Sequence, residues 1–160
     1  MIRAKDIMNT NILTVDPEET VEEVMRRMIE RGVSGLPVVD MADQLVGIVT
    51  EFDLLDLVWN PDTARNKVYH YMTRDVRTID EDDELIAVAE LFRMLPIRRL
   101  LVMRGNKIAG IISRRDLIRY VLQVRGAGPA RDHDDLAVPF PSDIALPPDG
   151  HTPNELPEYL

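Results

Sequence analysis

Residues 47–53 read GIVTEFD, and residues 110–116 read GIISRRD. In each copy a short apolar run ends at a hydroxyl residue, an aspartate follows three positions later, and an apolar helical pattern comes next. This order predicts a β-strand that leads directly into a helix. Thr50 and Ser113 stand where an N-cap belongs, so their oxygens can accept hydrogen bonds from the open amides of the first helical turn.

A hydroxyl residue with an acid at the third following position is also an ordinary capping box, which has a purely structural role. A cap requires neither the same glycine three residues upstream, nor the same apolar run, nor the same following helix. Because the whole context is repeated, the pattern favours a ligand site that is built twice.

The composition is that of an ordinary globular chain. Its 160 residues are 45% hydrophobic and 29% charged, and no apolar run approaches the about 20 residues that cross a bilayer. The first residues lack a secretory signal pattern, so we expect a cytoplasmic protein with no membrane partner. The absence of cysteine excludes disulfides and thiol catalysis, and the three scattered histidines offer no spacing for a metal site.

The charge of the chain argues against nucleic-acid binding. The formal net charge is −9, whereas nonspecific binding to nucleic acid depends on cations that neutralise phosphates. Aromatic residues make up 5% of the chain, too few for a base-stacking platform. A nucleic-acid-binding module is therefore the weaker alternative.

An internal repeat runs through most of the chain. Met8 aligns with Met72 at an offset of 64 residues, and Asp53 aligns with Asp116 at an offset of 63. The lost residue falls in a predicted hairpin turn, as expected of two copies of one structural unit. We therefore divide the chain into a first unit at 1–62, a second unit at 63–125 and a tail at 126–160.

Each unit is expected to contain a short extended piece, a helix, a hairpin and a second helix. The extended pieces are predicted at 11–15 and 75–79, and the first helix is predicted to start with Asp16 as N-cap and Pro17 at its first position. The second unit has a similarly acidic start at 80–84. The predicted core face of the first helix is Val21, Val24, Met25 and Met28, and that of the second is Leu85, Val88, Ala89 and Phe92. The hairpin strands are predicted at 36–39 and 45–50 in the first unit and at 100–103 and 108–113 in the second.

The last helix of each unit, at 52–59 and 116–124, is apolar on more than one face. One small sheet cannot cover all of these side chains, which predicts a homodimer built on the two helices. The tail differs in character, because it holds seven of the eleven prolines and seven acids against Arg131 alone. It is predicted to be extended or disordered, with partial order near Phe140 and Leu146.

With these motifs found twice, residues 1 to about 125 resemble a pair of CBS domains, the regulatory module named after cystathionine β-synthase. The segments 5–8 and 69–72, 33–39 and 97–102 match the same pattern, and nothing in the tail does. The resemblance implies an α+β fold in which two β-α-β-β-α units are related by a pseudo-twofold axis and form two clefts. It also implies a disc-like dimer.

The resemblance further implies an adenosine ligand such as AMP, ADP, ATP or S-adenosylmethionine, with no other cofactor. The aspartate at the helix start would accept from the ribose diol, and the hydroxyl residue and helix amides would lie near ribose and phosphate. Apolar residues of the opposite unit would hold the adenine. The implied site residues are Asp116, Ser113, Ile97, Arg98, Arg99, Arg115, Met8, Ile12 and Leu13 for one cleft and Asp53, Thr50, Val33, Met72, Val76 and Arg77 for the other.

The two clefts are not expected to be equal. Four arginines surround the second motif, whereas the first motif has Ser34, Gly35, Glu51 and Phe52 at the corresponding positions. An anionic nucleotide is therefore expected to prefer the cleft that ends in Asp116, unless the arginines only decorate the surface. The arginines concerned are Arg98, Arg99, Arg114 and Arg115.

The sequence thus predicts a regulatory, nucleotide-sensing module without catalytic activity, since no nucleophile with a base and no phosphate-binding glycine loop is present. Such a module implies a regulated protein partner. The alternative is a structural dimerisation or adaptor protein with unoccupied clefts, whose working part is the acidic tail.

Overall fold

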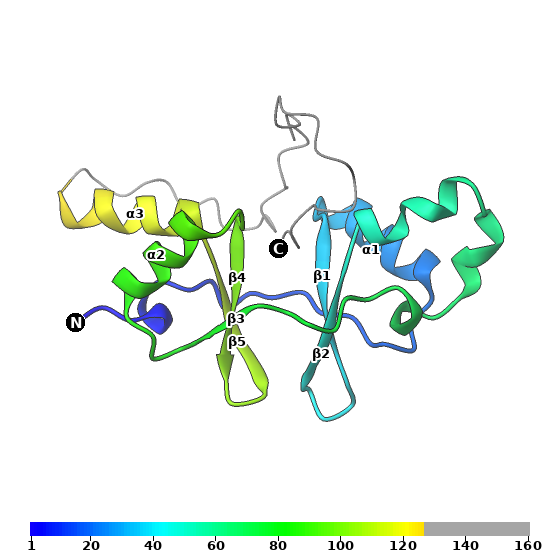
Figure 1. The fold of residues 1–160 in the computed structure, drawn as a ribbon, viewed down its shortest axis with the longest axis horizontal. Helices are drawn as coiled ribbons and strands as arrows, with labels where there is room; N and C mark the ends of the chain where they lie inside the picture. The colour runs from blue at the N-terminus through cyan, green and yellow to red at the C-terminus, as the bar shows by residue number, and fades with distance from the viewer. Residues whose placement is uncertain (127–160) are drawn as a thin grey trace.

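Two similar lobes lie side by side in the computed structural model, which describes residues 1–126 (Figure 1). In each lobe a β-hairpin faces the centre of the molecule and helices lie on the outer side. The elements in chain order are η1 (Ala4–Asp6), α1 (Val21–Arg31), β1 (Gly35–Val39), β2 (Leu45–Thr50), η2 (Phe52–Val58), η3 (Pro61–Arg65), η4 (Val68–His70), β3 (Thr78–Asp80), α2 (Leu85–Met94), β4 (Arg99–Arg104), β5 (Lys107–Ser113) and α3 (Arg114–Val124), where η marks a 3-10 helix.

The hairpins form where pairs of short apolar runs joined by turn residues predict them. Strand β1 pairs antiparallel with β2, and β4 pairs antiparallel with β5. The second turn places Gly105 at φ 60°, a left-handed conformation that glycine adopts without steric cost. In the second lobe β3 lies parallel to β4 and completes a three-stranded sheet. The predicted extended piece at 11–15 is wrong as a strand, because only Val15 forms a bridge, to Val38.

The predicted core faces of the two amphipathic helices are confirmed. Val21, Val24 and Met28 of α1 are buried, as are Val88 and Phe92 of α2. Each lobe has its own hydrophobic core, to which the helix contributes one side and the hairpin the other. The repeated sequence therefore builds two repeated packing units.

The predicted start of the first helix is wrong. Asp16 instead closes a tight turn, in which its Oδ1 accepts from the Glu18 amide at 2.8 Å. Helix α1 begins four residues later, where the side chains of Thr20 and Glu23 form a reciprocal capping box. An aspartate satisfies a turn as readily as a helix end, so the residue type alone did not distinguish the two.

The second helix start is likewise displaced from the acidic run. Asp80 accepts from the Asp82 amide within a turn, as Asp16 does in the first lobe. Helix α2 begins at Leu85 after Glu84, which makes no side-chain capping bond. The acidic residues thus stabilise the turn before the helix rather than the helix itself.

Each lead-in segment packs against the opposite lobe. The Ala4 amide donates to the Asp83 carbonyl at 2.9 Å, and Ala4 is fully buried in the second core. In the same way the Val68 amide donates to the Glu19 carbonyl at 3.0 Å, and Val68 is fully buried in the first core. This exchange ties the lobes together, and the boundary at residue 62 stays a prediction.

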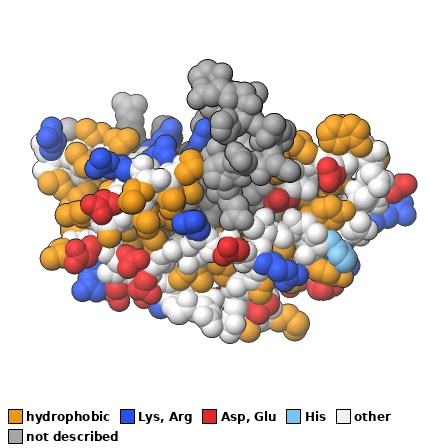
Figure 2. Space-filling model, viewed as in Figure 1, with side chains coloured by type: hydrophobic (Ala, Val, Ile, Leu, Met, Phe, Trp, Pro, Cys, Tyr) orange, Lys and Arg blue, Asp and Glu red, His pale blue; other side chains and the backbone are white. Residues whose placement is uncertain are grey.

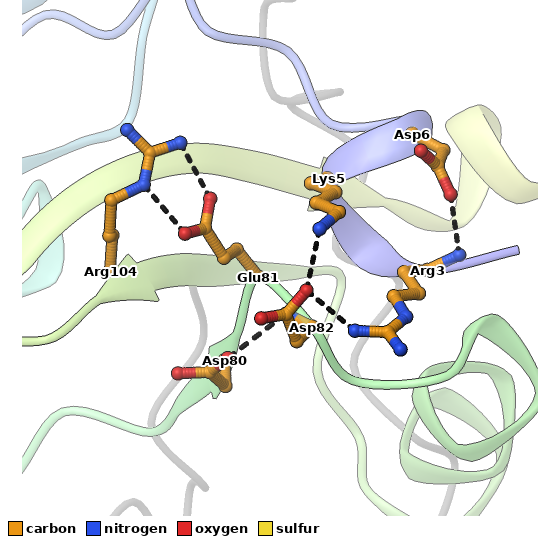
Figure 3. A network of polar contacts seen from close by, with 7 residues as sticks. All are labelled: Arg3, Lys5, Asp6, Asp80, Glu81, Asp82 and Arg104. Atoms are coloured by element: carbon orange, nitrogen blue, oxygen red, sulfur yellow. Dashed lines mark hydrogen bonds and ion pairs between the residues drawn. The ribbon is translucent and has the colours of Figure 1, made fainter.

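An ionic network anchors the N-terminal segment to the second lobe (Figure 3). Asp82 Oδ1 accepts from Lys5 Nζ at 2.7 Å and from Arg3 Nη1 at 2.8 Å. The hydrogen bond from Lys5, followed by the one from Arg3, lowers the pKa of Asp82. Nearby, Arg104 and Glu81 form a bidentate pair with both distances at 2.6 Å. These contacts are exposed, so they position the segment more than they stabilise the fold.

The predicted order near Phe140 and Leu146 lies outside the described residues. Across residues 1–126, no helix is long and apolar enough to span a membrane. Within the same range, no group of three or more histidine, aspartate or glutamate side chains is arranged to hold a metal ion.

Candidate functional site

The junction between β5 and α3 forms the reciprocal cap that the sequence predicts. Asp116 Oδ2 accepts from the Ser113 amide at 2.7 Å and from Ser113 Oγ at 2.6 Å. Ser113 Oγ in turn accepts from the Asp116 amide at 3.4 Å. The hydroxyl and the carboxylate are therefore fixed side by side at the mouth of an 11-residue helix.

The junction between β2 and η2 differs in its backbone. Asp53 Oδ2 again accepts from the amide and hydroxyl of Thr50, at 2.7 and 2.9 Å. The following helix is a 3-10 helix whose N-cap is Glu51, so the prediction of Thr50 as an N-cap is wrong. A 3-10 helix turns every three residues, which suits the burial of Leu54 and Leu57 toward the core. Carboxylate and hydroxyl nevertheless meet in the same way at both junctions.

The remaining oxygen of each aspartate has a different environment. Asp116 Oδ1 accepts from Arg119 Nη1 at 3.0 Å, an i,i+3 ion pair on the surface of α3. Asp53 Oδ1 has no hydrogen-bond partner among residues 1–126. Burial raises the pKa of Asp53, and the two hydrogen bonds from Thr50 oppose that effect. Asp53 Oδ1 can thus accept a hydrogen bond from a diol directly. Asp116 Oδ1 can do so once its ion pair with Arg119 opens.

The pKa shift of Asp53 predicts a pH-dependent cost to folding. Above the raised pKa of Asp53 its half-buried carboxylate is charged, and this charge lowers the stability of the fold. As the pH falls from the raised folded-state pKa toward the unfolded-state pKa, the folded state takes up the proton first, so the cost disappears. Asp53→Asn is therefore expected to gain stability over the parent at pH 7, and the gain is expected to shrink on acidification.

Urea unfolding of parent and Asp53→Asn from pH 7 to pH 4 measures this difference. Asp56→Asn, an exposed position on the same helix, is the matched control and should show no such trend. A stability difference for Asp53→Asn that grows on acidification would contradict the assignment.

Arginines gather around the second junction. Arg99 lies opposite Ser113 in the β4–β5 register, and the Arg114 amide donates to the Arg98 carbonyl at 3.3 Å. Burial lowers the pKa of Arg99; the charge of Asp116 opposes this, and the charges of Arg115 and Arg98 add to it. Arg98 and Arg99 are both half-buried, which disfavours the alternative that arginines of this pair only decorate the surface.

The first junction lacks this charge, as predicted. Gly35 lies opposite Thr50, and the Glu51 amide donates to the Ser34 carbonyl at 2.8 Å, in the place of the Arg114–Arg98 bond. The two junctions therefore share a backbone arrangement while their charges differ.

Lead-in residues from the opposite unit lie beside each motif glycine. A Cβ added to Gly110 would lie 2.5 Å from Met8 Sδ, and one added to Gly47 would lie 2.8 Å from Met72 Sδ. Each glycine thus permits the close approach of a methionine, a role that the sequence pattern did not reveal. The structure brings Met8 and Met72 to the predicted strands, and their contact with a ligand stays a prediction.

The other predicted site residues are less uniformly placed. Val33 and Ile97 are buried in the two cores, and Leu13 packs against the first core. Arg77 is exposed, and Ile12 and Val76 are half-buried. The core positions leave little side-chain surface for a ligand.

A cavity of about 590 Å³ lies at the other ends of β2 and β5, between the hairpin turns. The turns meet there, since the Leu45 amide donates to the Asn106 carbonyl at 3.1 Å. Of the predicted site residues only Val76 lines this cavity, and neither motif aspartate does. Gln44, Arg74 and Asn106, which also line it, were not predicted, because turn residues of separate units give no shared local signal.

Comparison with protein-family models shows matches to the CBS domain at residues 4–60 and 68–123. An uncharacterised 17.7 kDa protein of Acidianus ambivalens is 33% identical over 123 residues, which cover 76% of this chain and 74% of that protein. Inosine-5'-monophosphate dehydrogenase of Methanocaldococcus jannaschii is 36% identical over 118 residues, which cover 73% of this chain but 23% of that enzyme. The chain thus spans most of one relative and under a quarter of the other.

Solved structures similar to this chain include two with adenosine compounds bound. CBSX2 in complex with AMP superposes with a TM-score of 0.68 at 28% identity, over 78% of this chain and 99% of that one. The CBS domain pair of protein MJ0100, in complex with 5'-methylthioadenosine and S-adenosyl-L-methionine, gives a TM-score of 0.63 at 25% identity, over 78% of this chain and 98% of that one. Both ligand-bound structures match the described part of this chain over nearly their whole length.

Proposed function

Because this chain belongs to the CBS domain family, we propose that it is a regulatory module that binds an adenosine nucleotide at its strand-to-helix junctions and has no catalytic activity of its own. It would transmit nucleotide levels to a protein partner. The tandem CBS fold is present, and CBS-pair neighbours of this chain bind AMP or S-adenosylmethionine.

The observation that carries this proposal is the pairing of a carboxylate with a hydroxyl at both junctions. Asp116 and Ser113 in one, and Asp53 and Thr50 in the other, are held within 2.9 Å of each other. A carboxylate is acceptor-only and suits the two donors of a ribose diol. At the second junction the positive end of the α3 dipole and the arginines suit a phosphate.

A thermal-shift screen with AMP, ADP, ATP and S-adenosylmethionine tests the proposal. A ligand at a hundred times its dissociation constant stabilises the folded state by about 2.7 kcal/mol, or roughly 5–10 °C for a chain of this size. The double variant Asp53→Ala/Asp116→Ala should lose that shift. If none of the four compounds shifts the melting temperature, the result favours the alternative of an adaptor protein with unoccupied clefts. If the double variant keeps the shift, the ligand binds at a site other than the two junctions.

We also propose that the module is a homodimer joined through η2 and α3. Phe52, Leu55 and Val58 lie three residues apart, so they form one stripe along the 3-10 helix, and they are 62%, 49% and 73% exposed. Ile118, Val121 and Leu122 form a similar exposed stripe at i, i+3 and i+4 on α3. Apolar stripes on two helices are typical of a protein interface.

Leu122→Glu is expected to weaken the dimer at least about tenfold, because it would bury a charge without a partner. Sedimentation velocity over a range of concentrations measures the change. Gln123→Glu adds the same charge at the adjacent exposed position and should leave the dimer intact. A parent chain that sediments as a monomer at every concentration would refute the dimer itself.

A further inference from the structure

From residue 93 onward the chain separates its charges along the sequence. Residues 93–125 contain nine cations and a single acid, Asp116. The following residues, 126–160, contain seven acids and a single cation, Arg131. A cationic segment is thus followed directly by an anionic one, whereas the chain as a whole is acidic. The cations are Arg93, Arg98, Arg99, Arg104, Lys107, Arg114, Arg115, Arg119 and Arg125.

The fold concentrates part of this positive charge at the start of α3. We define the arginine cluster as Arg98, Arg99, Arg114, Arg115 and Arg119. Its members come from the start of β4 and the first turns of α3, which meet through the Arg114–Arg98 backbone bond. Figure 2 shows several Lys and Arg side chains over the region of α3 at the upper left of the view.

Three members of this cluster have no acidic partner in the described chain. Arg119 pairs with Asp116, but Arg98, Arg114 and Arg115 make no ion pair with any residue of 1–126. Like charges held close together repel, as the effect of Arg98 and Arg115 on the pKa of Arg99 shows. An anion bound at this surface would relieve that repulsion.

We propose that the acidic segment 132–135 of the chain's own tail binds the arginine cluster. Asp132, Asp134 and Asp135 supply three carboxylates within four residues, and carboxylates form bidentate pairs with guanidinium groups. The cluster thereby becomes an interaction surface whose occupant is supplied by the same chain.

The connecting chain is long enough for this contact. Helix α3 has 11 residues and is about 17 Å long, so the tail leaves it about that far from the cluster. Asp132 follows Gly126 by six residues, which extend to about 20 Å. Gly126 has φ 70°, a left-handed conformation that turns the chain at the helix end. A short tether also gives the segment an effective concentration in the millimolar range.

One consequence rests on the proposed function. The arginine cluster surrounds the junction at which a nucleotide phosphate is proposed to bind, so the acidic segment and the phosphate compete for the same cations. The tail would then raise the nucleotide concentration at which the module responds.

Paramagnetic relaxation tests the contact without any nucleotide. The chain has no cysteine, so Ala137→Cys allows a single spin label beside the acidic segment. We expect strong relaxation enhancement at the amides of 113–119 and little at the β1–β2 turn, residues 41–44. Replacing Asp132, Asp134 and Asp135 with asparagine should abolish the enhancement, and 0.5 M salt should weaken it.

Matched neutralisation of Glu18, Glu30 and Asp62, which are exposed in the first lobe, should change nothing. Enhancement that is spread evenly over both lobes, or that survives neutralisation of the tail, would overturn the proposal. Enhancement on an unlabelled copy mixed with labelled protein would assign the occupant to a second chain and also overturn it.

Calorimetry with inorganic tripolyphosphate tests the competition. The tail-neutralised variant should bind this anion at least threefold more tightly than the parent. Equal affinities would refute competition, while the relaxation data decide on the contact itself. Because neither measurement uses an adenosine compound, both are separate from the test of the proposed function.

Discussion

Gly110→Ala is expected to destabilise the chain by about 1–3 kcal/mol, the usual cost of adding a methyl group to a packed core. The new Cβ would lie 2.5 Å from Met8 Sδ, 2.6 Å from its Cγ and 2.9 Å from its Cβ. Since Met8 Cβ cannot move without its backbone, the lead-in segment itself must shift. Urea unfolding monitored by circular dichroism measures the loss.

A second substitution tests whether the loss of stability comes from the clash with Met8 or from another effect of replacing the glycine. Met8→Ala removes the two nearest atoms, so Gly110→Ala/Met8→Ala should recover part of the loss relative to Met8→Ala alone. At Gly47 the added Cβ would also lie 2.8 Å from the Thr73 carbonyl oxygen, which is backbone. Met72→Ala should therefore rescue Gly47→Ala less well than Met8→Ala rescues Gly110→Ala.

Gly105→Ala is the control, because nothing lies within 4 Å of the Cβ it would carry and only the backbone conformation resists it. An unchanged stability of Gly110→Ala would mean that Met8 does not pack on β5 in solution. That result would also remove the structural basis for an inter-unit site at this strand.

The hairpins and helix core faces could be predicted from the sequence because their signals are local. Short apolar runs and turn residues placed both hairpins to within about a residue, and the spacing of Val21, Val24 and Met28 identified the buried side of α1. The helix starts could not be read in the same way. Asp16 and Thr20 are both good capping residues, and only the reciprocal bond between Thr20 and Glu23 settles which one begins the helix.

Contacts between residues far apart in the sequence could not be predicted from local patterns. Nothing near Ala4 or Val68 in the sequence shows that each belongs to the core of the opposite lobe. The same holds for the two junctions, whose motifs are alike in sequence but lead into an α-helix in one case and a 3-10 helix in the other. The candidate site was predictable as a repeated motif. The difference between the helices that follow the two motifs depends on packing and could not be predicted from them.

The exchange of lead-in segments also explains why the site residues are spread over the whole chain. Each junction takes its carboxylate and hydroxyl from one unit and its flanking methionine from the other. A ligand at either junction would therefore touch both units at once. Binding and the relative position of the two units are then coupled, as a sensing module requires.

Asp116→Ala is expected to weaken the binding of AMP about tenfold or more, and Asp53→Ala is expected to weaken it less. A hydrogen bond to a charged group is worth about 1.5–3 kcal/mol, and a loss of 1.4 kcal/mol is tenfold in affinity. The inequality follows from charge, since Arg98, Arg99 and Arg115 adjoin Asp116, while no arginine occupies the corresponding positions beside Asp53. Arg74 lines the cavity at the other end of β2, and Arg77, which is predicted for the cleft with Asp53, is exposed.

The capping role of Asp116 has to be separated from its role toward a ligand. Asp116 Oδ2 accepts two bonds from Ser113, so Asp116→Ala also weakens the start of α3. Asp116→Asn is the matched control, because its amide oxygen can still accept the bonds from Ser113 while the carboxylate charge is removed. Calorimetry with AMP on the three variants, each shown to be folded by circular dichroism, measures the losses. If Asp53→Ala costs as much affinity as Asp116→Ala, or more, the arginines do not direct the nucleotide. If Asp116→Asn binds AMP as tightly as the parent, the loss in Asp116→Ala belongs to the helix start and not to the carboxylate.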